Sequence, residues 1–198
     1  MIELQSHSVV SDGQLEPAGV VEEAAKAGVT VLALTDHDGV AGVPEAMEAG
    51  QRLGVEIVPA VEMSSVHEYA EDLHICGYWV DVEKITPACE RAQEERRSRA
   101  KKIVQNLRDH GFDVTFEDAV REAGAADAIG RPHIAKAAGA TGNLGPFFEE
   151  WLVPGAKAFV SREWPDANEA CALIREAGGV PVIAHPYWDI KVPEQVEE

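Results

Sequence analysis

The chain has few basic residues, few cysteines and no long apolar segment. Its 17 lysines and arginines are outnumbered by 35 aspartates and glutamates, which leaves a net charge of −18 with histidine neutral. A surface this acidic repels polyphosphates, so it argues against long DNA or RNA and against anionic membranes as partners. No apolar stretch approaches the ~20 residues of a membrane-spanning helix. The three cysteines lie far apart without a CxxC pair, which argues against a disulfide framework and a thiolate zinc site.

The rest of the composition is ordinary for a globular protein, with 45% hydrophobic and 26% charged residues. A length of 198 residues suits one domain, or one domain with an insertion. The first residues, MIEL, carry neither the basic nor the apolar segment of a signal peptide, so we expect a cytoplasmic protein. A small phosphorylated ligand is compatible with the acidic surface where metal ions or a local basic pocket reverse the field.

Two kinds of segment alternate in the first ninety residues. Continuously apolar, β-branched runs occur at 29–35, 55–61 and 73–80, and such runs are typical of strands covered on both faces. Alanine-rich segments at 17–27 and 44–53 lie between them, each with proline near its start and glycine just past its end, as helices have. The pattern predicts βαβ units and therefore a parallel sheet.

The middle of the chain, from about residue 86 to 143, predicts helices without strands. A long charged stretch ends at Gly111, and Thr115 with Asp118 then resembles a capping box. We interpret the basic residues of the long stretch as a solvated helix face, because acidic neighbours allow i,i+4 pairs. The alternative is a patch that guides a nucleotide or short RNA into a cleft. These basic residues are Arg96, Arg97, Arg99, Lys101 and Lys102. The strand rhythm resumes at 157–160 and 180–184, with a helix expected at 166–177.

Polar side chains follow the expected strands. They are Gln5, His7, Asp12, Asp36, His37, Glu62, His74 and His185. In parallel α/β barrels the carboxyl ends of the strands carry the active site, because the loops that follow them converge there. Imidazole and carboxylate together are the ligands of zinc, manganese and iron. Two or three such ions would polarise a phosphoryl oxygen and lower the pKa of a bound water, so the pattern favours hydrolysis of phosphate esters.

The motifs QSHS, LALTDHDGVAG, VPAVEMS, DLHICGY, GRPHIA and AGGVPVIAHP resemble those of the PHP (polymerase and histidinol phosphatase) family of metal-dependent phosphoesterases. The resemblance extends over nearly the whole chain. It is greatest to the branch that removes a phosphate from nucleoside 3′,5′-bisphosphates, which includes relatives that trim short RNA 5′ ends. It implies an α/β fold, a distorted (β/α)7 barrel at residues 1–85 and 156–198, with a helical insertion at 86–155.

The resemblance also implies up to three divalent ions, Mn²⁺, Zn²⁺ or Fe²⁺. The first site would use Gln5, His7, Glu62 and a late aspartate. The second would use Glu62, His74 and His185, and the third Asp12, His37 and a late histidine. The expected reaction is attack on phosphorus by a metal-activated hydroxide.

Four residues are predicted to be catalytic: Asp36, His37, Arg131 and His133. Arg131 and His133 match the RPH element that holds the substrate phosphate in the family, since a guanidinium suits bidentate contact with phosphate. The alternative for this element is a plain helix start with proline in its first turn. Asp36 and Asp38 either orient an imidazole or cap the turn into Gly39.

Two departures from the family pattern leave other functions open. Gln5 replaces the first histidine of the HxH motif, and the late aspartate and histidine do not occur, so only the second site has a complete ligand set. We therefore expect a barrel that is incomplete at its C-terminal end, and whether a partner subunit completes it is left open. One alternative is a degenerate PHP domain that acts as a binding or scaffold module. The other is the same chemistry on a sugar phosphate, histidinol phosphate or an oligonucleotide end.

Overall fold

Five strands form one curled sheet in the order β1-β2-β3-β4-β5. The computed structural model describes residues 1–68, 70–124, 126 and 129–186. The strands are β1 (Ile2–Glu3), β2 (Val31–Leu34), β3 (Glu56–His67), β4 (Ala70–Tyr78) and β5 (Val180–Ile183). The first three strands are parallel, whereas β4 is antiparallel to both β3 and β5. The predicted mixed α/β class is confirmed, with the sheet curled into a half-barrel.

Two helices cover the parallel part of the sheet, α1 (Pro17–Lys26) and α2 (Val43–Leu53). Each has proline in its first turn, and α2 ends at Gly54, whose φ of 72° is the left-handed conformation that glycine adopts at little cost. Val21 of α1 packs with Leu32 and Leu34 of β2 in a buried cluster that also includes α2. These elements match the predicted βαβαβ pattern.

The expectation of a wholly parallel sheet is wrong at β4. Residues 62–72, expected to connect two strands, are themselves strand for most of their length, and β3 and β4 form a hairpin that turns between His67 and Ala70. A parallel pair needs a crossover of a dozen or more residues, and this connection is far too short. The hairpin places Ser64 opposite His74 and Glu62 opposite Cys76.

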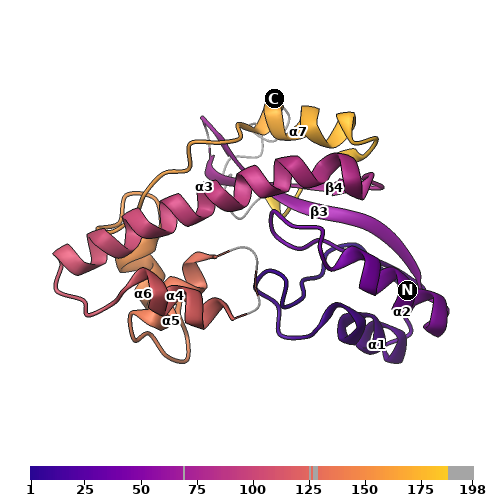
Figure 1. The fold of residues 1–198 in the computed structure, drawn as a ribbon, viewed down its shortest axis with the longest axis horizontal. Helices are drawn as coiled ribbons and strands as arrows, with labels where there is room; N and C mark the ends of the chain where they lie inside the picture. Colours follow the sequence, from indigo (N-terminus) through magenta and orange to yellow (C-terminus); the bar gives the residue numbers. More distant parts are fainter. Residues whose placement is uncertain (69, 125, 127–128, 187–198) are drawn as a thin grey trace.

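Helix α3 (Val82–Asp109) spans much of the length of the molecule, from the sheet to a group of shorter helices (Figure 1). It begins earlier than predicted because Asp81 caps it, accepting hydrogen bonds from the backbone N–H groups of Glu83 and Lys84. The shorter elements are α4 (Phe116–Ala123), α5 (Arg131–Ala137), α6 (Gly145–Phe147) and the π-helix η1 (Phe148–Leu152). Together with the second half of α3 they enclose their own apolar cluster, which includes Ile103, Leu107, Ile134 and Leu152.

The predicted strand at 157–160 is not a strand in the structure. Residues 157 and 158 form a turn, and Ala158 is buried in the apolar cluster of the helices. The helix predicted at 166–177 is α7 (Ala167–Glu176), which Asp166 caps and which packs on β3 and β4. The chain continues into β5, which pairs with β4 and leaves Val180 and Val182 exposed at the edge of the sheet.

The predicted division into a barrel and an insertion at 86–155 stays a prediction. Helix α3 crosses its first boundary, since Ile85 and Cys89 belong to the apolar cluster of the sheet and Ile103 to that of the helices. The part of the predicted barrel at 187–198 lies outside the described residues. Among the residues that are described, no helix combines the length and apolar character needed to cross a bilayer. The cytoplasmic location stays a prediction.

Candidate functional site

Glu62 is the centre of the histidine cluster. Its carboxylate is fully buried on β3, and its neighbours come from three other segments of the chain. Oε1 lies 2.7 Å from Nδ1 of His74 and 3.1 Å from Nε2 of His185. Oε2 lies 3.4 Å from Nε2 of His7 and accepts a hydrogen bond of 2.8 Å from the amide nitrogen of Gln5. One buried carboxylate thus joins four of the predicted ligand residues.

A tight loop after β1 carries His7 and Asp12. Ser8 and Ser11 both donate to the buried carboxylate of Asp36, at 2.7 Å for each hydroxyl, and the backbone N–H of Ser8 donates to it as well. Asp36 therefore holds the loop in place. It is not among the described residues that line the cavity beside the histidine cluster, which is described below. A Cβ atom at residue 13 would lie 2.3 Å from the carbonyl oxygen of His7, so only glycine allows this loop to close.

The loop after β2 brings His37 beside Glu62. A parallel β-bridge joins the two residues, and Nδ1 of His37 lies 3.8 Å from Oε1 of Glu62. Nε2 of His37 lies 3.7 Å from Asp12, and the His37 ring stacks on that of His7 with centroids 4.7 Å apart. His37 therefore lies with His7 and Glu62 as well as with Asp12.

Asp38, the next residue, turns away into the protein. Its φ of 49° is left-handed, and its buried carboxylate accepts hydrogen bonds from the backbone N–H of Ser64 and from Arg96. Burial opposes the charge, but Arg96 and Arg162 outweigh burial and lower the pKa of Asp38 to about 2. Asp38 is thus the ionic anchor that ties the loop to α3.

Two overlapping groups of side chains have the composition and spacing of metal sites. The ligand atoms of each lie within 4.8 Å of one another, and both groups contain Glu62. The groups are His7, His37 and Glu62, and Glu62, His74 and His185. The second is the complete site predicted from the sequence. The first unites His37 with His7, which the prediction had assigned to separate ions.

The hydrogen bonding of these groups fits divalent cations. The buried Nδ1 atoms of His7, His37 and His74 have no hydrogen-bond partner, although Nδ1 of His74 is 2.7 Å from a carboxylate oxygen. Buried imidazole nitrogens without a hydrogen-bond partner, gathered around a carboxylate, are suited to bind a cation. Burial and the neighbouring charges of His74 and Arg96 hold the pKa of His37 below its usual range. Burial opposes the charge of Glu62, but the His7 and His74 imidazoles hold its pKa far below the ordinary value. A neutral imidazole and an ionised carboxylate are the forms that bind metal.

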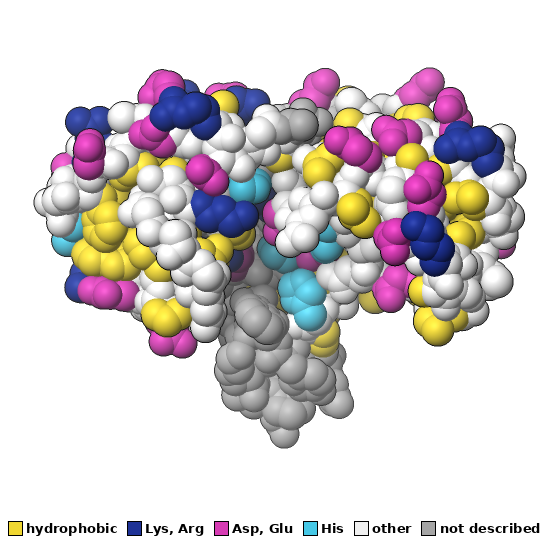
Figure 2. Space-filling model, turned by 90° about the horizontal axis from the view of Figure 1, so that it is seen from below, with side chains coloured by type: hydrophobic (Ala, Val, Ile, Leu, Met, Phe, Trp, Pro, Cys, Tyr) yellow, Lys and Arg dark blue, Asp and Glu magenta, His cyan; other side chains and the backbone are white. Residues whose placement is uncertain are grey.

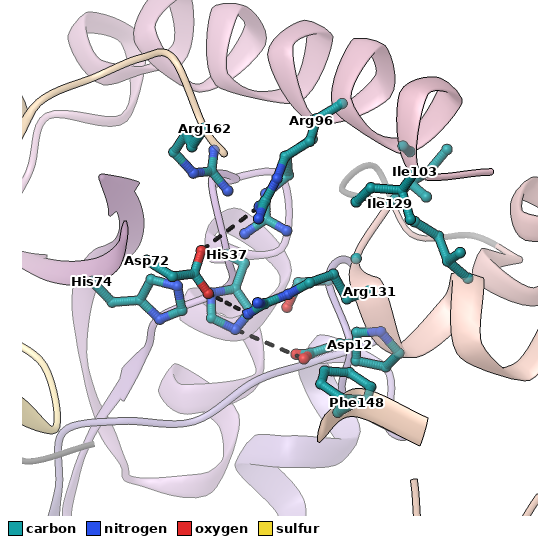
Figure 3. Close-up of a pocket in the computed structure, with 16 residues that line it drawn as sticks. Asp12, His37, Asp72, His74, Arg96, Ile103, Ile129, Arg131, Phe148 and Arg162 are labelled. Carbon is teal, nitrogen blue, oxygen red and sulfur yellow. Dashed lines mark hydrogen bonds and ion pairs between the residues drawn. The ribbon is translucent and has the colours of Figure 1, made fainter. Parts of the chain in front are cut away.

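A cavity of about 120 Å³ opens beside this cluster (Figure 3). Asp12, His37 and His74 form one wall. Four arginines from three segments of the chain form the other, and they are Arg96, Arg99, Arg131 and Arg162. On the surface, histidine side chains gather in the hollow between the two halves of the molecule (Figure 2).

The two predicted residues of the RPH element differ in their position relative to the cavity. Arg131, the first residue of α5, lines the cavity, where it forms an ion pair with Asp72 and donates to the backbone oxygen of Leu152. His133 is buried and is not among the described residues that line the cavity. Its Nδ1 accepts a hydrogen bond of 3.1 Å from the backbone N–H of Gly130, and burial lowers its pKa. The ring is therefore neutral, with its proton on Nε2. The alternative interpretation of this element, a helix start with proline in its first turn, also describes the structure, since Pro132 lies in the first turn of α5.

The sequence prediction missed the buried arginines. Arg96 and Arg99 were expected on a solvated face, but both point inward from α3, and Arg99 is only 6% exposed. Lys101 and Lys102 do face solvent, as predicted. Their spacing could have indicated that they point inward, because Arg96 and Arg99 fall on the same helical face as the buried residues Ala92 and Ile103. Asp72, which pairs with Arg99 and Arg131, begins the DLHICGY motif but was not among the predicted site residues.

The comparison with known families agrees with the geometry. A family model described as the PHP domain matches residues 3–135. The chain belongs to the PHP family. This membership confirms the predicted family, and with it the class of enzyme, a hydrolase of phosphoric esters.

Individual PHP relatives match most of the chain. A 5′-3′ exoribonuclease of Haemophilus influenzae is 36% identical over 189 residues, 93% of this chain and 68% of that protein. A 3′,5′-nucleoside bisphosphate phosphatase of Chromobacterium violaceum is 34% identical over 190 residues, 93% of this chain and 66% of that protein. A crystal structure from Bifidobacterium adolescentis is described as a metal-dependent phosphoesterase, and its sequence is 30% identical to this chain. The two structures superpose with a TM-score of 0.85, and the match covers 99% of this chain and 72% of that one. The chain thus spans about two thirds of the length of these curated PHP relatives.

Proposed function

We propose that this protein is a metal-dependent phosphomonoesterase that hydrolyses a nucleoside 3′,5′-bisphosphate to the nucleoside 5′-monophosphate and phosphate. The observation that carries the proposal is the pair of ligand groups sharing Glu62 at one wall of an arginine-lined cavity. A cation site facing guanidinium groups suits a phosphate ester, whose oxygens can contact both walls at once. The similarity to the Chromobacterium violaceum phosphatase supports the choice of substrate.

The first step is binding of the ester between the two walls. Glu62, His7, His37, His74 and His185 would hold divalent ions such as Mn²⁺, Zn²⁺ or Fe²⁺, together with Asp12 and Gln5. When bound, such ions neutralise phosphoryl oxygens and lower the pKa of a water molecule. Arg131, at the opposite wall, donates to the phosphoryl group, while Nε2 of His133 holds the proton of that ring.

In the chemical step, a water oxygen bonds to phosphorus and the bond from phosphorus to the 3′ oxygen breaks. The 3′ oxygen takes a proton and leaves as the nucleoside hydroxyl. The guanidinium of Arg131 stabilises the charge that develops on the phosphoryl oxygens, since a fixed donor in a largely buried site needs no reorganisation.

The test is release of inorganic phosphate from adenosine 3′,5′-bisphosphate, with metal content measured by plasma mass spectrometry. We expect chelator-treated protein to release none and added Mn²⁺ to restore release. Hydrolysis that survives complete removal of metal would overturn the mechanism. Parallel assays with ribose 5-phosphate, histidinol phosphate and a short oligonucleotide test the alternative substrates.

Gln5 favours one competing function, a binding or scaffold module. A neutral amide is a weak ligand for zinc-like ions, and Gln5 is where the PHP motif has histidine. If the protein binds metal at both ligand groups but hydrolyses none of these esters, the result would support this second candidate and reject the first.

A further inference from the structure

Asp36 connects the three segments of the chain that carry the first of the two ligand groups. The members of this first ligand group are His7, His37 and Glu62. The carboxylate of Asp36 accepts three hydrogen bonds of 2.7 Å, from the backbone N–H and the hydroxyl of Ser8 and from the hydroxyl of Ser11. Its backbone oxygen accepts a bond of 3.2 Å from the N–H of Glu62, and His37 is the next residue in the chain. One residue thus contacts or adjoins every segment of the group.

The carboxylate of Asp36 is enclosed by the protein. Asp36 is 2% exposed, and among the described residues it belongs to neither ligand group and does not line the cavity. Its Oδ1 accepts from the N–H of Ser8 and from Ser11, and its Oδ2 accepts from the hydroxyl of Ser8. A Cβ atom at Gly42 would lie 3.3 Å from Oδ2, so the start of α2 packs against this oxygen. Asp36 therefore acts on the site through the segments that it holds.

The bonds to Asp36 attach the loop of residues 7–13 to the segment that follows β2. Within the loop, the N–H groups of Ser11 and Gly13 donate to the backbone oxygen of Ser8, at 3.1 and 2.9 Å, which closes the turn without fixing its place. Ser8 and Ser11 are 0% and 2% exposed, so water has little access to the donors that Asp36 receives. Without the carboxylate these buried donors would lack an acceptor, which is unfavourable enough to shift the loop.

The same loop sets distances among the ligand atoms. Nε2 of His7 lies 3.4 Å from Oε2 of Glu62, and the rings of His7 and His37 stack with centroids 4.7 Å apart. Asp12, at the other end of the loop, points to His37, with an oxygen 3.7 Å from Nε2 (Figure 3). A functional site needs its groups held to within about 0.5 Å, so a shift of this loop should weaken the first ligand group.

The second ligand group, which consists of Glu62, His74 and His185, is held in a different way. Antiparallel pairing of β3 with β4 and of β4 with β5 fixes the strands that carry it. The N–H of Ala184, beside His185, donates to the backbone oxygen of His74 at 2.9 Å. Among the described residues, the side chain of Asp36 bonds to the loop of residues 7–13 and not to these strands. Loss of that side chain should therefore affect the two groups unequally.

We propose that Asp36 is a positioning residue that gives the first ligand group its affinity for a divalent ion, by holding the loop that carries His7. The inference rests on the proposed function, because it takes this group as a metal site. Loss of a residue that orients metal ligands typically weakens metal binding about 10- to 100-fold. The role depends on where the carboxylate oxygens lie, so an amide of the same shape should preserve most of it.

The test is titration of metal-free protein with Mn²⁺, in which electron paramagnetic resonance measures the free ion. Two backgrounds isolate the groups, since His185→Ala leaves the first group complete and His7→Ala leaves the second complete. We expect Asp36→Ala to weaken Mn²⁺ binding about 10- to 100-fold in the His185→Ala background and to leave it unchanged in the His7→Ala background. Equal weakening in both backgrounds, or unchanged binding in the first, would overturn the proposal.

Asp36→Asn separates the position of the side chain from its charge. The amide oxygen can accept at Oδ1, and the hydroxyl of Ser8 can accept from the amide nitrogen, so the affinity of the first group should stay within about threefold of its parent. A loss as large as that in Asp36→Ala would show that charge sets the affinity, which would reject the positioning role.

Two further variants control for effects on folding. Ser8→Ala removes one of the three bonds to Asp36, and it should cause a smaller loss with the same selectivity. It decides the question if Asp36→Ala does not fold, because equal loss in both backgrounds, or none, would contradict the proposal. Leu107→Ala, in the apolar cluster of the helices, should lower the thermal midpoint of unfolding and change neither Mn²⁺ affinity.

The outcome is separable from that of the proposed function. A selective loss of Mn²⁺ in Asp36→Ala, in a protein that releases no phosphate from adenosine 3′,5′-bisphosphate, would reject the phosphatase and keep the positioning role. Phosphate release that depends on Mn²⁺, with unchanged Mn²⁺ affinity in Asp36→Ala, would keep the phosphatase and reject the positioning role. If His185→Ala binds no Mn²⁺, the first group is not a metal site and the inference fails, while the wild-type assay still tests the phosphatase.

Discussion

The two walls of the cavity bury charge in opposite ways. Around Glu62, one carboxylate is surrounded by imidazoles and an amide, and the buried ring nitrogens lack partners. Around Asp38 and Asp72, carboxylates are outnumbered by guanidinium groups, and buried N–H donors lack partners. The first arrangement favours a cation and the second an anion. A phosphate ester with bound metal ions combines cations with an anion, so the two walls together complement a single ligand.

The walls also differ in how they are built. The histidine wall consists of short side chains on the strands and on the loops that follow them. Backbone hydrogen bonds position these segments, such as the bond of 2.9 Å from the N–H of Asp38 to the backbone oxygen of Glu62. The arginine wall consists of long side chains from α3, α5 and the loop before α7, positioned by ion pairs with distant residues. Changes in the first wall should abolish metal binding, whereas changes in the second should alter stability and ligand preference. The following variants test this contrast.

Glu62→Gln should have the largest effect, because Glu62 belongs to both ligand groups. A neutral amide removes the only carboxylate that they share, so both ions should be lost, and phosphate release should fall by about 10³-fold or more. Metal analysis and the phosphate assay measure this, with the exposed Glu56→Gln on the same strand as the control. Retention of the full metal content would contradict the shared carboxylate.

Asp38→Asn should destabilise the fold most, because it leaves Arg96 buried without its carboxylate and leaves Arg162 with Glu95 alone. Removing one partner of a buried ion pair costs roughly 3–5 kcal/mol, which urea unfolding measures against the exposed Asp113→Asn. The folded-state pKa of Asp38, about 2, lies below its ordinary value of 3.8. Its contribution is therefore present above the ordinary pKa and lost as the pH falls towards 2. A wild type and an Asp38→Asn variant with the same acid sensitivity would refute this.

His185→Ala should affect one ligand group and spare the other. The group of His7, His37 and Glu62 does not contain His185, so we expect partial metal content with a loss of at least ~10² in rate. His110→Ala, at the far end of α3, is the matched control. Full activity of His185→Ala would remove this residue from the metal site.

Gln5→His should have the smallest effect and the opposite sign. Gln5 donates to Glu62 beside His7, so a histidine there adds an imidazole to the first group. We expect more Mn²⁺ to bind at limiting metal concentration, or a higher rate. An unchanged metal titration would indicate that the first group binds Mn²⁺ equally well with glutamine or histidine at position 5.

Much of this protein could be predicted from short segments of its sequence. The capping box of Thr115 and Asp118 is present as predicted, since a helix cap needs only residues within one turn. The PHP motifs identified the family. The predicted ligands Glu62, His74 and His185 lie together because β3 pairs with β4 and β4 pairs with β5. The site roles of Asp36, Arg131 and His133 stay predictions.

The tertiary structure alone decided the hairpin, the turn at 157–158 and the arginine wall. Arg99 is buried because Asp72, 27 residues earlier in the chain, lies opposite it, and Arg162 because Asp38 does. Local sequence determines which residues begin a helix, end a strand or favour a metal. Spacing within one helix shows which face an arginine lies on, but which carboxylate it meets depends on the distant segment that packs against that face.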